Sequence, residues 1–418
     1  MNMRLAIVFV LTACAPAFCG GGAPLSWQDC QEAALKSNPS LASYRNARDA
    51  ARFTYSAARN NLYPALSASH SYSRGGNNYG SGPADSWGAN LGISQTLFNP
   101  KTYAGIAVQL KAAEQADISL HQAAVAARAN LLNSFNSLIY AQTGVNVAKR
   151  IYDIRRQNAD TVALQYQGGT QSKGNMMYAR AQAEQARATI AQAERAVISG
   201  RRDLAKNLGM DEFSALASSG ELSVPVSASG ISIDDAARNV PAVMAAAKQL
   251  ETARAQLDLA GSDLYPSLSA NGGLNWSGQQ EFPGNRAWTL GAALTWPLFS
   301  NGPTYHKNTV ASARSQLEKT REDYRSAFLG AKSDLQSALA QLDNSIDSAG
   351  VSAQMLSAAR QRYGESSIEY LAGTINFQNW EDVSQSLVSA EQDYLGSLLT
   401  VNKARAQLDS LLGIPLGE

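Results

Sequence analysis

The side chains that most often carry out chemistry are few and scattered in this sequence. Three histidines, His70, His121 and His306, lie far apart along the chain, and no group of His, Cys and Asp has the spacing of a metal site. The pair Gly168-Gly169 lacks the preceding strand and the spacing of a phosphate-binding loop. The sequence therefore predicts no enzyme, no cofactor and no metal centre.

The N-terminal residues indicate export, and the cysteines do not indicate catalysis. Residues 1–19 combine a positive start, a short apolar core and small residues, which is the pattern of a signal peptide. The letters LTAC ending at Cys14 resemble a lipoprotein cleavage box, so Cys14 is a candidate for lipidation, with ordinary cleavage near Ala17 or Cys19 as the alternative. Cys30 stands in a helical apolar pattern and is expected to be a buried structural thiol.

The overall charge gives no sign of a polyanionic partner such as nucleic acid. The chain has 418 residues and a formal net charge of +1, so no overall field points to nucleic acid. Charged residues make up 17% of the chain, below the roughly 25% that is usual in soluble domains. No stretch in the mature chain approaches the length of about 18 continuous apolar residues that a transmembrane helix needs.

The chain contains the same order of parts twice. Leu-Tyr-Pro occurs at 62–64 and again at 264–266, and a proline interrupts a helical pattern at Pro39 and at Pro241, with the same offset between copies. Each copy predicts a helix, two strands, one very long helix, a glycine turn and a return helix. The predicted repeats are residues 20–216 and 231–418, joined by a linker at 217–230 that contains Ser, Gly and Pro.

After each Leu-Tyr-Pro the pattern changes from helical to strict alternation. Leu66 and Ala68 fall on one face, and Ser67 and Ser69 on the other. Four strands are expected, at about 64–74, 87–98, 266–277 and 287–298. Each has about ten residues, enough for a tilted strand to cross a bilayer.

Two interpretations of these strands fit the alternation. A soluble antiparallel sheet with one wet face would alternate identically. A membrane sheet is favoured because the polar face holds Ser, Thr, Asn and Gly with almost no Lys or Glu, and because Trp and Tyr mark the strand ends. Four strands cannot close a barrel, and an open edge cannot face lipid. Membrane strands therefore require an oligomer, and three chains would share twelve strands.

The remaining segments read as long helices with alanine-rich seams. They are expected at 103–165, 172–208, 304–365 and 376–412. The stretch from Tyr103 to Tyr166 would be about 95 Å long as one helix, far beyond a compact domain. Alanine on the packed faces indicates that neighbouring helices approach closely.

Taken together, these motifs resemble the outer-membrane efflux protein family, the TolC-like outer membrane factors. The resemblance covers essentially the whole mature chain and rests on the order and duplication of short motifs: Asn38-Pro39-Ser40-Leu41, Leu-Tyr-Pro before each hairpin, Gln95-Thr96-Leu97-Phe98 and Thr295-Trp296-Pro297-Leu298-Phe299 after it, and Gly-Thr at each tip. No single motif is specific by itself.

The resemblance implies a mainly α protein with a membrane β-barrel. Three chains would form a twelve-stranded barrel in the outer membrane above an α-helical tunnel in the periplasm. Such a homotrimer would be the passive exit duct of a tripartite efflux or type I secretion system, fed by a periplasmic adaptor protein and an inner-membrane pump of RND or ABC type. The alternatives are a non-transporting coiled-coil trimer with a structural or adhesive role, and a simple diffusion porin.

The resemblance also implies roles for the two helical tips. The turn at Gly168, Gly169 and Thr170 and the turn at Gly373 and Thr374 would be the periplasmic entrance and the adaptor contact.

A ring of acidic residues closes the entrance in many members of the family, and its positions map here onto Asn379 and Asp382, with Glu381 beside them. In the family both positions usually carry Asp and form two acidic rings. Asn379 stands in place of one of these Asp residues, so Asp382 is the acid that remains. Three copies of Asp382 near an axis would repel one another and could bind a cation or protons. The alternative is that Asp382 and Glu381 form an ordinary solvated helix face.

Overall fold

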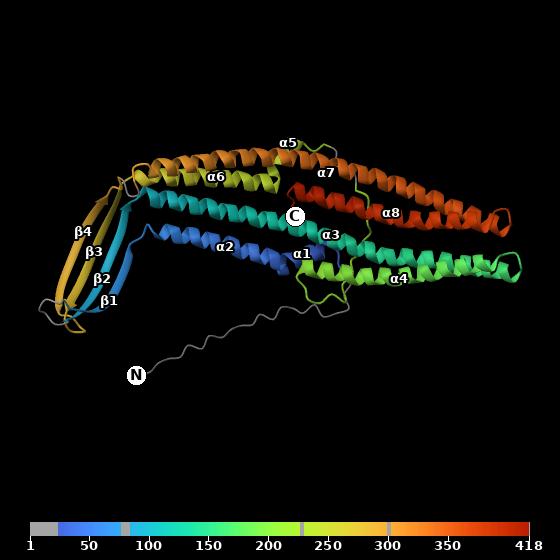
Figure 1. The fold of residues 1–418 in the computed structure, drawn as a ribbon, viewed down its shortest axis with the longest axis horizontal. Helices are drawn as coiled ribbons and strands as arrows, with labels where there is room; N and C mark the ends of the chain where they lie inside the picture. The colour runs from blue at the N-terminus through green and yellow to red at the C-terminus, as the bar shows by residue number, and fades with distance from the viewer. Residues whose placement is uncertain (1–23, 77–83, 226–229, 299–301, 418) are drawn as a thin grey trace. The chain divides into compact units, whose positions relative to one another are not determined.

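The computed structural model describes residues 24–76, 84–225, 230–298 and 302–417 (Figure 1). The predicted signal peptide at 1–19 and the candidate Cys14 lie outside these residues. The chain forms two compact units: unit 1 contains residues up to Glu32 and Ser134–Leu222, and unit 2 contains Ala33–Asn133 and Ser223–Glu418. The division falls inside the first sequence repeat, so the compact units and the sequence repeats are different partitions of the chain.

The order of elements is the same in both repeats and is mainly helical, which confirms the predicted fold class. The first repeat contains α1 (Trp27–Ser37), α2 (Pro39–Asn60), β1 (Ala65–Gly75), β2 (Ala84–Phe98), α3 (Pro100–Gln167) and α4 (Lys173–Leu208). The second contains α5 (Ile233–Asn239), α6 (Pro241–Gly261), a 3₁₀ turn at Ser262–Leu264, β3 (Ser267–Gly278), β4 (Asn285–Thr295), α7 (Tyr305–Leu371) and α8 (Phe377–Leu411). None of the described helices has both the length and the apolar character that crossing a membrane requires.

Local sequence explains where the first helices begin. The hydroxyl of Ser26 accepts a hydrogen bond from the backbone N–H of Asp29 (3.2 Å), whose carboxylate accepts in return from the N–H of Ser26 (3.0 Å). The Ser26 hydroxyl also donates to the Asp29 carboxylate at 2.7 Å, and this bond, together with the one from the Ser26 N–H, lowers the pKa of Asp29. Asn38 caps α2 by accepting from the N–H groups of Ser40 (2.9 Å) and Leu41 (3.1 Å), and Pro39 takes the first helical position. The Asn-Pro pair therefore separates α1 from α2, as the sequence predicts.

The four strands form one antiparallel sheet in the order β1-β2-β3-β4. Its register aligns the apolar positions of all four strands, for example in the row Leu66, Ile93, Gly272, Leu290. The polar positions align in the same way, as in the row Ser67, Gly92, Gly273, Thr289. One face is therefore apolar and the other polar across the whole sheet, and β1 and β4 are its two edges.

Glycines keep the polar face of the sheet thin. A Cβ atom added to Gly88 would lie 3.0 Å from the Ser71 hydroxyl oxygen, and one added to Gly92 would lie 3.1 Å from that of Ser67. The serines therefore occupy space that a larger neighbour would need. The polar layer is made of hydroxyls and amides that stay close to the backbone.

In unit 2, α7 packs against α5, α6 and α8, and small residues dominate the contact. The core contains Leu335, Leu342, Val243 and Val401, each at most 2% exposed, and alanines fill the positions between them: Ala237, Ala331, Ala338, Ala349 and Ala404. Alanine lets helix axes approach closely because its side chain is a single methyl group. This confirms the close helix packing that the alanine-rich seams predict.

A network of four charges also joins the two repeats within unit 2. Lys111 and Glu114 of α3 meet Lys248 and Glu251 of α6, and all four lysine–glutamate N–O distances are 3.0 Å. Hydrogen bonds from Lys248 and Lys111 lower the pKa of Glu114, and the same lysines lower that of Glu251. Each charge faces two of opposite sign, so the network favours one register between α3 and α6.

Unit 1 contains the later part of α3 and its antiparallel partner α4. Gly200 of α4 lies close to α3, because an added Cβ would be 3.4 Å from a methyl carbon of Leu138. The rings of Trp27 and Phe135 meet at 5.7 Å, and Leu25 forms a parallel bridge with Ser218. The start of the linker between the repeats is therefore held against the residues just before α1.

We predict that Gly413→Ala lowers the thermal unfolding temperature of the purified protein more than Gly373→Ala. Both glycines have a left-handed backbone, with φ of 75° and 77°, so both substitutions share a strain of about 1 kcal/mol. Only at Gly413 would the new Cβ be crowded, at 3.1 Å from the Asn239 carbonyl oxygen and 3.3 Å from Pro241. That crowding adds about 1–3 kcal/mol. Equal shifts at one protein concentration would contradict this packing.

Candidate functional site

The tip between α7 and α8 is a turn that requires glycine. Gly373 has a φ of 77°, and its N–H donates to the Tyr370 carbonyl at 3.1 Å. The N–H of Thr374 donates to the Glu369 carbonyl at 3.0 Å, and the Thr374 hydroxyl donates to the same oxygen at 2.9 Å. Gly373 thus supplies the left-handed conformation, and Thr374 satisfies the Glu369 carbonyl near the end of α7.

The tip between α3 and α4 repeats these bonds. Gly169 has a φ of 76°, and the N–H and hydroxyl of Thr170 donate to the Gln165 carbonyl at 2.9 and 3.0 Å. Gly168 precedes it and donates its N–H to the Leu164 carbonyl at 3.0 Å. The shared Gly-Thr motif is therefore explained by helix capping. A role of these residues in adaptor contact remains a prediction.

The return helices start with equivalent caps. The Ser172 hydroxyl accepts from the N–H of Asn175 at 3.1 Å, and the Asn376 side chain accepts from the N–H of Asn379 at 2.8 Å. Asn379 therefore lies in the first turn of α8, with its backbone bound in the cap and its side chain exposed.

The second tip contains a buried aromatic cluster. The rings of Tyr370 and Trp380 stack at 4.2 Å with an angle of 9°, and Phe377 lies 6.4 Å from each. The indole N–H of Trp380 donates to the Ser367 hydroxyl at 3.2 Å, and burial raises the pKa of Tyr370. Trp380 is 3% exposed. It packs the end of the hairpin and does not present a surface to a substrate.

The three candidate gate residues do not share one environment. Asp382 is exposed, and its carboxylate accepts a hydrogen bond from the Gln378 side chain at 3.0 Å. Glu381 is only 5% exposed, because successive helical residues point about 100° apart. The alternative in which both acids form a solvated face is therefore wrong for Glu381.

Asn379 and Asp382 line one groove near the tip. The groove has a volume of about 530 Å³, and its walls come from α7, the turn and α8: Arg362, Glu365, Ser366, Glu369, Ile375, Asn379, Asp382, Val383 and Ser386. Three acidic residues and one arginine line the groove, so it is acidic. Within the described part of the chain, no group of three or more His, Cys, Asp or Glu residues has the geometry of a metal site.

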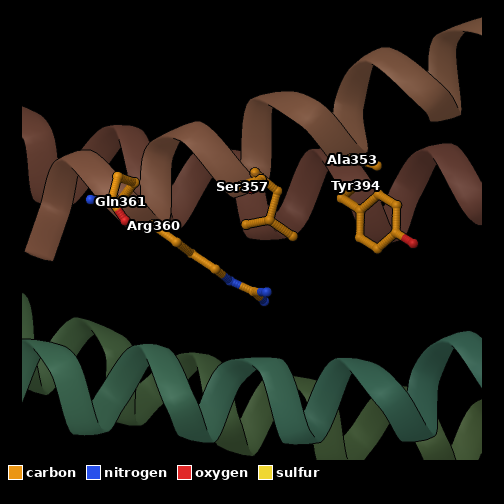
Figure 2. Close-up of a pocket in the computed structure, with 6 residues that line it drawn as sticks. Ala353, Ser357, Arg360, Gln361 and Tyr394 are labelled. Atoms are coloured by element: carbon orange, nitrogen blue, oxygen red, sulfur yellow. The ribbon is translucent and has the colours of Figure 1, made fainter.

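Sequence reasoning missed a second polar site farther along the same helix pair. Arg360 of α7 donates from Nε (3.0 Å) and Nη2 (2.6 Å) to one carboxylate oxygen of Glu391 in α8, which is 8% exposed. Arg360 lines a pocket of about 470 Å³ together with Ala353, Leu356, Ser357, Gln361 and Tyr394. Figure 2 shows its extended side chain. The ion pair neutralises a buried carboxylate and fixes α7 against α8. The sequence feature that points to this ion pair is an acidic residue, Glu391, at a core position of α8.

This fold, with a glycine turn at each helical tip, is that of a known protein family. The family described as "Outer membrane efflux protein" matches residues 31–210 and 232–414. The chain belongs to this family, whose members are efflux channels of the outer membrane and not enzymes. The protein therefore lies in the outer membrane and extends into the periplasm.

One relative and two solved structures that are similar to this chain are named as a resistance protein and as membrane channels. The cobalt-zinc-cadmium resistance protein CzcC of Cupriavidus metallidurans is 26% identical over 289 residues, which are 68% of this chain and 67% of that protein. The open state of the Neisseria gonorrhoeae MtrE outer membrane channel has a TM-score of 0.80 at 22% identity and covers 92% of this chain and 88% of its own. CusC has a TM-score of 0.83 at 18% identity, covering 92% and 91%. At these identities, the two solved structures show a shared fold.

We predict that Trp380→Ala increases amide hydrogen exchange at the α7–α8 tip, whereas Asp382→Ala does not. Removing a buried Trp costs about 3–5 kcal/mol, because it leaves a cavity beside Tyr370 and Phe377. The exposed Asp382 side chain fills no such space. Exchange measured by mass spectrometry on both variants checks this. Equal protection of the tip in both variants would contradict the packing role of Trp380.

Proposed function

We propose that this protein is the exit duct of a multi-component efflux system and that it works as a homotrimer. One observation carries the proposal: a four-stranded sheet with one apolar face, one uncharged polar face and two unpaired edges, β1 and β4. In lipid, each unpaired backbone group costs several kcal/mol, so the edges need partners. Three copies closing edge to edge make a twelve-stranded barrel.

The two faces of the sheet suit the two sides of such a barrel. Rows like Leu66, Ile93 and Leu290 would face lipid, and rows like Ser67 and Thr289 would face a water-filled lumen. Because the lumen side carries hydroxyls and amides and few charges, it would let varied cargo pass with little selection. Selection would then fall to the partner that delivers the cargo.

The long helices continue the conduit toward partners in the periplasm. We propose that a periplasmic adaptor contacts the tips around Gly168, Gly169 and Thr170 and around Gly373 and Thr374, and that an inner-membrane pump of RND or ABC type supplies the energy. Exposed apolar side chains support a protein contact at each tip: Leu164 and Met177 at the first tip, and Ile368 and Leu371 at the second, are 59–71% exposed.

The acidic groove near the second tip supplies the proposed gate. Asp382 and Asn379 line it together with Glu365 and Glu369. In a narrowed trimer, three copies of Asp382 would repel one another, and a divalent cation would relieve that repulsion. The buried Glu381 is not part of this gate.

The two other classes of protein fit these features less well. A simple porin has many more strands per chain and no long helices such as α3 and α7. A purely structural or adhesive trimer gives no reason for an uncharged polar face on all four strands. For cargo, the relative named as a cobalt-zinc-cadmium resistance protein makes divalent metal ions the first class to test.

The direct test is the mass and the conductance of the purified protein. We expect a trimer after detergent extraction and stable single-channel currents in planar bilayers, because closed edges create a continuous aqueous path. A monomer, or a trimer that never conducts, would overturn the proposal.

For the gate, we predict that Asp382→Asn weakens the block of current by divalent cations applied from the periplasmic side. The substitution keeps the shape of the side chain and removes three charges from the trimer. Asp347→Asn, an exposed carboxylate on α7 outside the groove, serves as the matched control and should leave the block unchanged. If Asp382→Asn also leaves the block unchanged, Asp382 is a surface charge without a gating role.

A further inference from the structure

Each repeat passes from helix to strand at its Leu-Tyr-Pro motif, and the two connections are built alike. In the first, the N–H of Tyr63 donates to the Asn60 carbonyl at 2.9 Å. In the second, the N–H of Tyr265 donates to the Ser262 carbonyl at 3.2 Å. Each tyrosine therefore reaches back three residues and closes a tight turn just before the strand begins.

A side chain from the returning strand binds the leucine carbonyl of each motif. Nε2 of Gln95, in β2, donates to the Leu62 carbonyl at 2.7 Å. Nε1 of Trp296, just after β4, donates to the Leu264 carbonyl at 3.0 Å. Each bond thus joins the entry of a β-hairpin to its exit. We call these two hydrogen bonds the joint bonds.

The two donors occupy the same position in the two repeats. When the Leu-Phe pairs at 97–98 and 298–299 are aligned, Gln95 falls opposite Trp296. An amide and an indole have little in common except an N–H group at the end of a side chain of similar reach. Both are directed at the carbonyl of the same motif, so the two repeats share the bond although they do not share the residue.

Gln95 is a polar side chain on the apolar face of the sheet. It follows Ile93 by two residues in β2, and Ile93 belongs to the apolar row described above. An amide on that face is costly unless its N–H groups are bound. Nε2 donates to the Leu62 carbonyl and also to the Thr96 carbonyl, at 2.9 Å. The joint bond therefore accounts for a residue that the alternation of the strand does not explain.

The connections that the joint bonds close are short. Residues 61–64 separate α2 from β1, and residues 262–266 separate α6 from β3. In the proposed barrel the strands are fixed by their neighbours, so any tilt of a helix against its strand would be concentrated in these connections. A bond from entry to exit opposes that tilt. Asp263 in the second connection also pairs with Lys101 at the start of α3, at 2.8 Å, which joins the two repeats at this level.

We propose that Gln95 and Trp296 are positioning residues for conduction, and that the joint bonds hold the barrel strands and the helices that lead into them as one continuous wall. This inference rests on the proposed function, because that function assigns the sheet to a barrel and the helices to the conduit that continues it. When the joint bonds are removed, the angle between helix and strand fluctuates and the current through the duct becomes unsteady.

Amide hydrogen exchange of the full-length protein, measured by mass spectrometry, tests the joint bonds themselves. Trp296→Phe keeps an aromatic ring without the N–H, and Gln95→Met keeps the length of the side chain without a donor. We expect peptides covering 62–66 in Gln95→Met, and 264–268 in Trp296→Phe, to exchange about fivefold faster, as the loss of one hydrogen bond predicts.

Two further variants separate the bond from the ring. Trp288→Phe is the matched control, because this tryptophan of β4 is 75% exposed and its indole forms no hydrogen bond among the described residues, so exchange should not change. Trp296→Gln gives the second connection the donor that the first one uses. Trp296 is 62% exposed, so little packing is lost, and we expect exchange close to that of the unaltered protein.

Two results would overturn the joint bonds. One is unchanged exchange in both Gln95→Met and Trp296→Phe. The other is exchange in Trp296→Gln that is as fast as in Trp296→Phe, since the ring and not the bond would then stabilise the connection.

Single-channel currents in planar bilayers test the role in conduction. We expect one steady level for the unaltered protein and for Trp296→Gln, and frequent transitions between levels when Gln95→Met and Trp296→Phe are combined, with the trimer mass unchanged. A steady current in the combined variant, despite faster exchange, would overturn the positioning role. An unaltered trimer that never conducts would instead overturn the proposed function, and hydrogen exchange would still decide whether the joint bonds hold the connections.

Discussion

The structure depends on one constraint, which is that backbone N–H and C=O groups cannot stay unpaired in lipid. A sheet of four strands leaves the outer sides of β1 and β4 open, and the chain contains no further strand among its described residues to cover them. We therefore propose that the chain pairs with copies of itself in the membrane. In that arrangement the apolar and polar faces, which are continuous across all four strands, would become the outside and the inside of one wall.

The long helices reflect the internal repeat of the chain. Each β-hairpin is followed by a helix of more than sixty residues, α3 with 68 and α7 with 67, and a Gly-Thr turn follows each helix. Alanine-rich contacts bring α6, α7 and α8 close together, and the network of Lys111, Glu114, Lys248 and Glu251 ties the two repeats across α3 and α6. The repeats nevertheless differ at their tips. The second tip has the stacked pair Tyr370 and Trp380, with an acidic groove beside it.

Features set by neighbours in the sequence could be predicted, and features set by tertiary contacts could not. The break at Asn38-Pro39 and the alternation after Pro64 are local, and both appear in the structure as expected. Asp382 and Glu381 are adjacent in the sequence, so their separation into exposed and buried positions needed the packing of α8 to be known. The Arg360–Glu391 pair joins positions of α7 and α8 whose contact no sequence pattern indicates. The glycine turn at each tip is predicted by the repeat itself, and the hydrogen bonds of each Gly-Thr pair show how the long helix before it is capped.

The central claim is that β1 of one copy pairs with β4 of the next. Disulfide trapping tests it most directly, with one cysteine on the polar face of β1, at Ser67, Ser69 or Ser71, and one on the polar face of β4, at Ala287, Thr289 or Gly291. Single-cysteine variants at either edge are the controls. We expect one combination of positions to give a covalent trimer on a denaturing gel after mild oxidation of intact cells, and the single variants to remain monomers. If no combination forms a trimer, or if the products stop at dimers in every register, the shared barrel is contradicted.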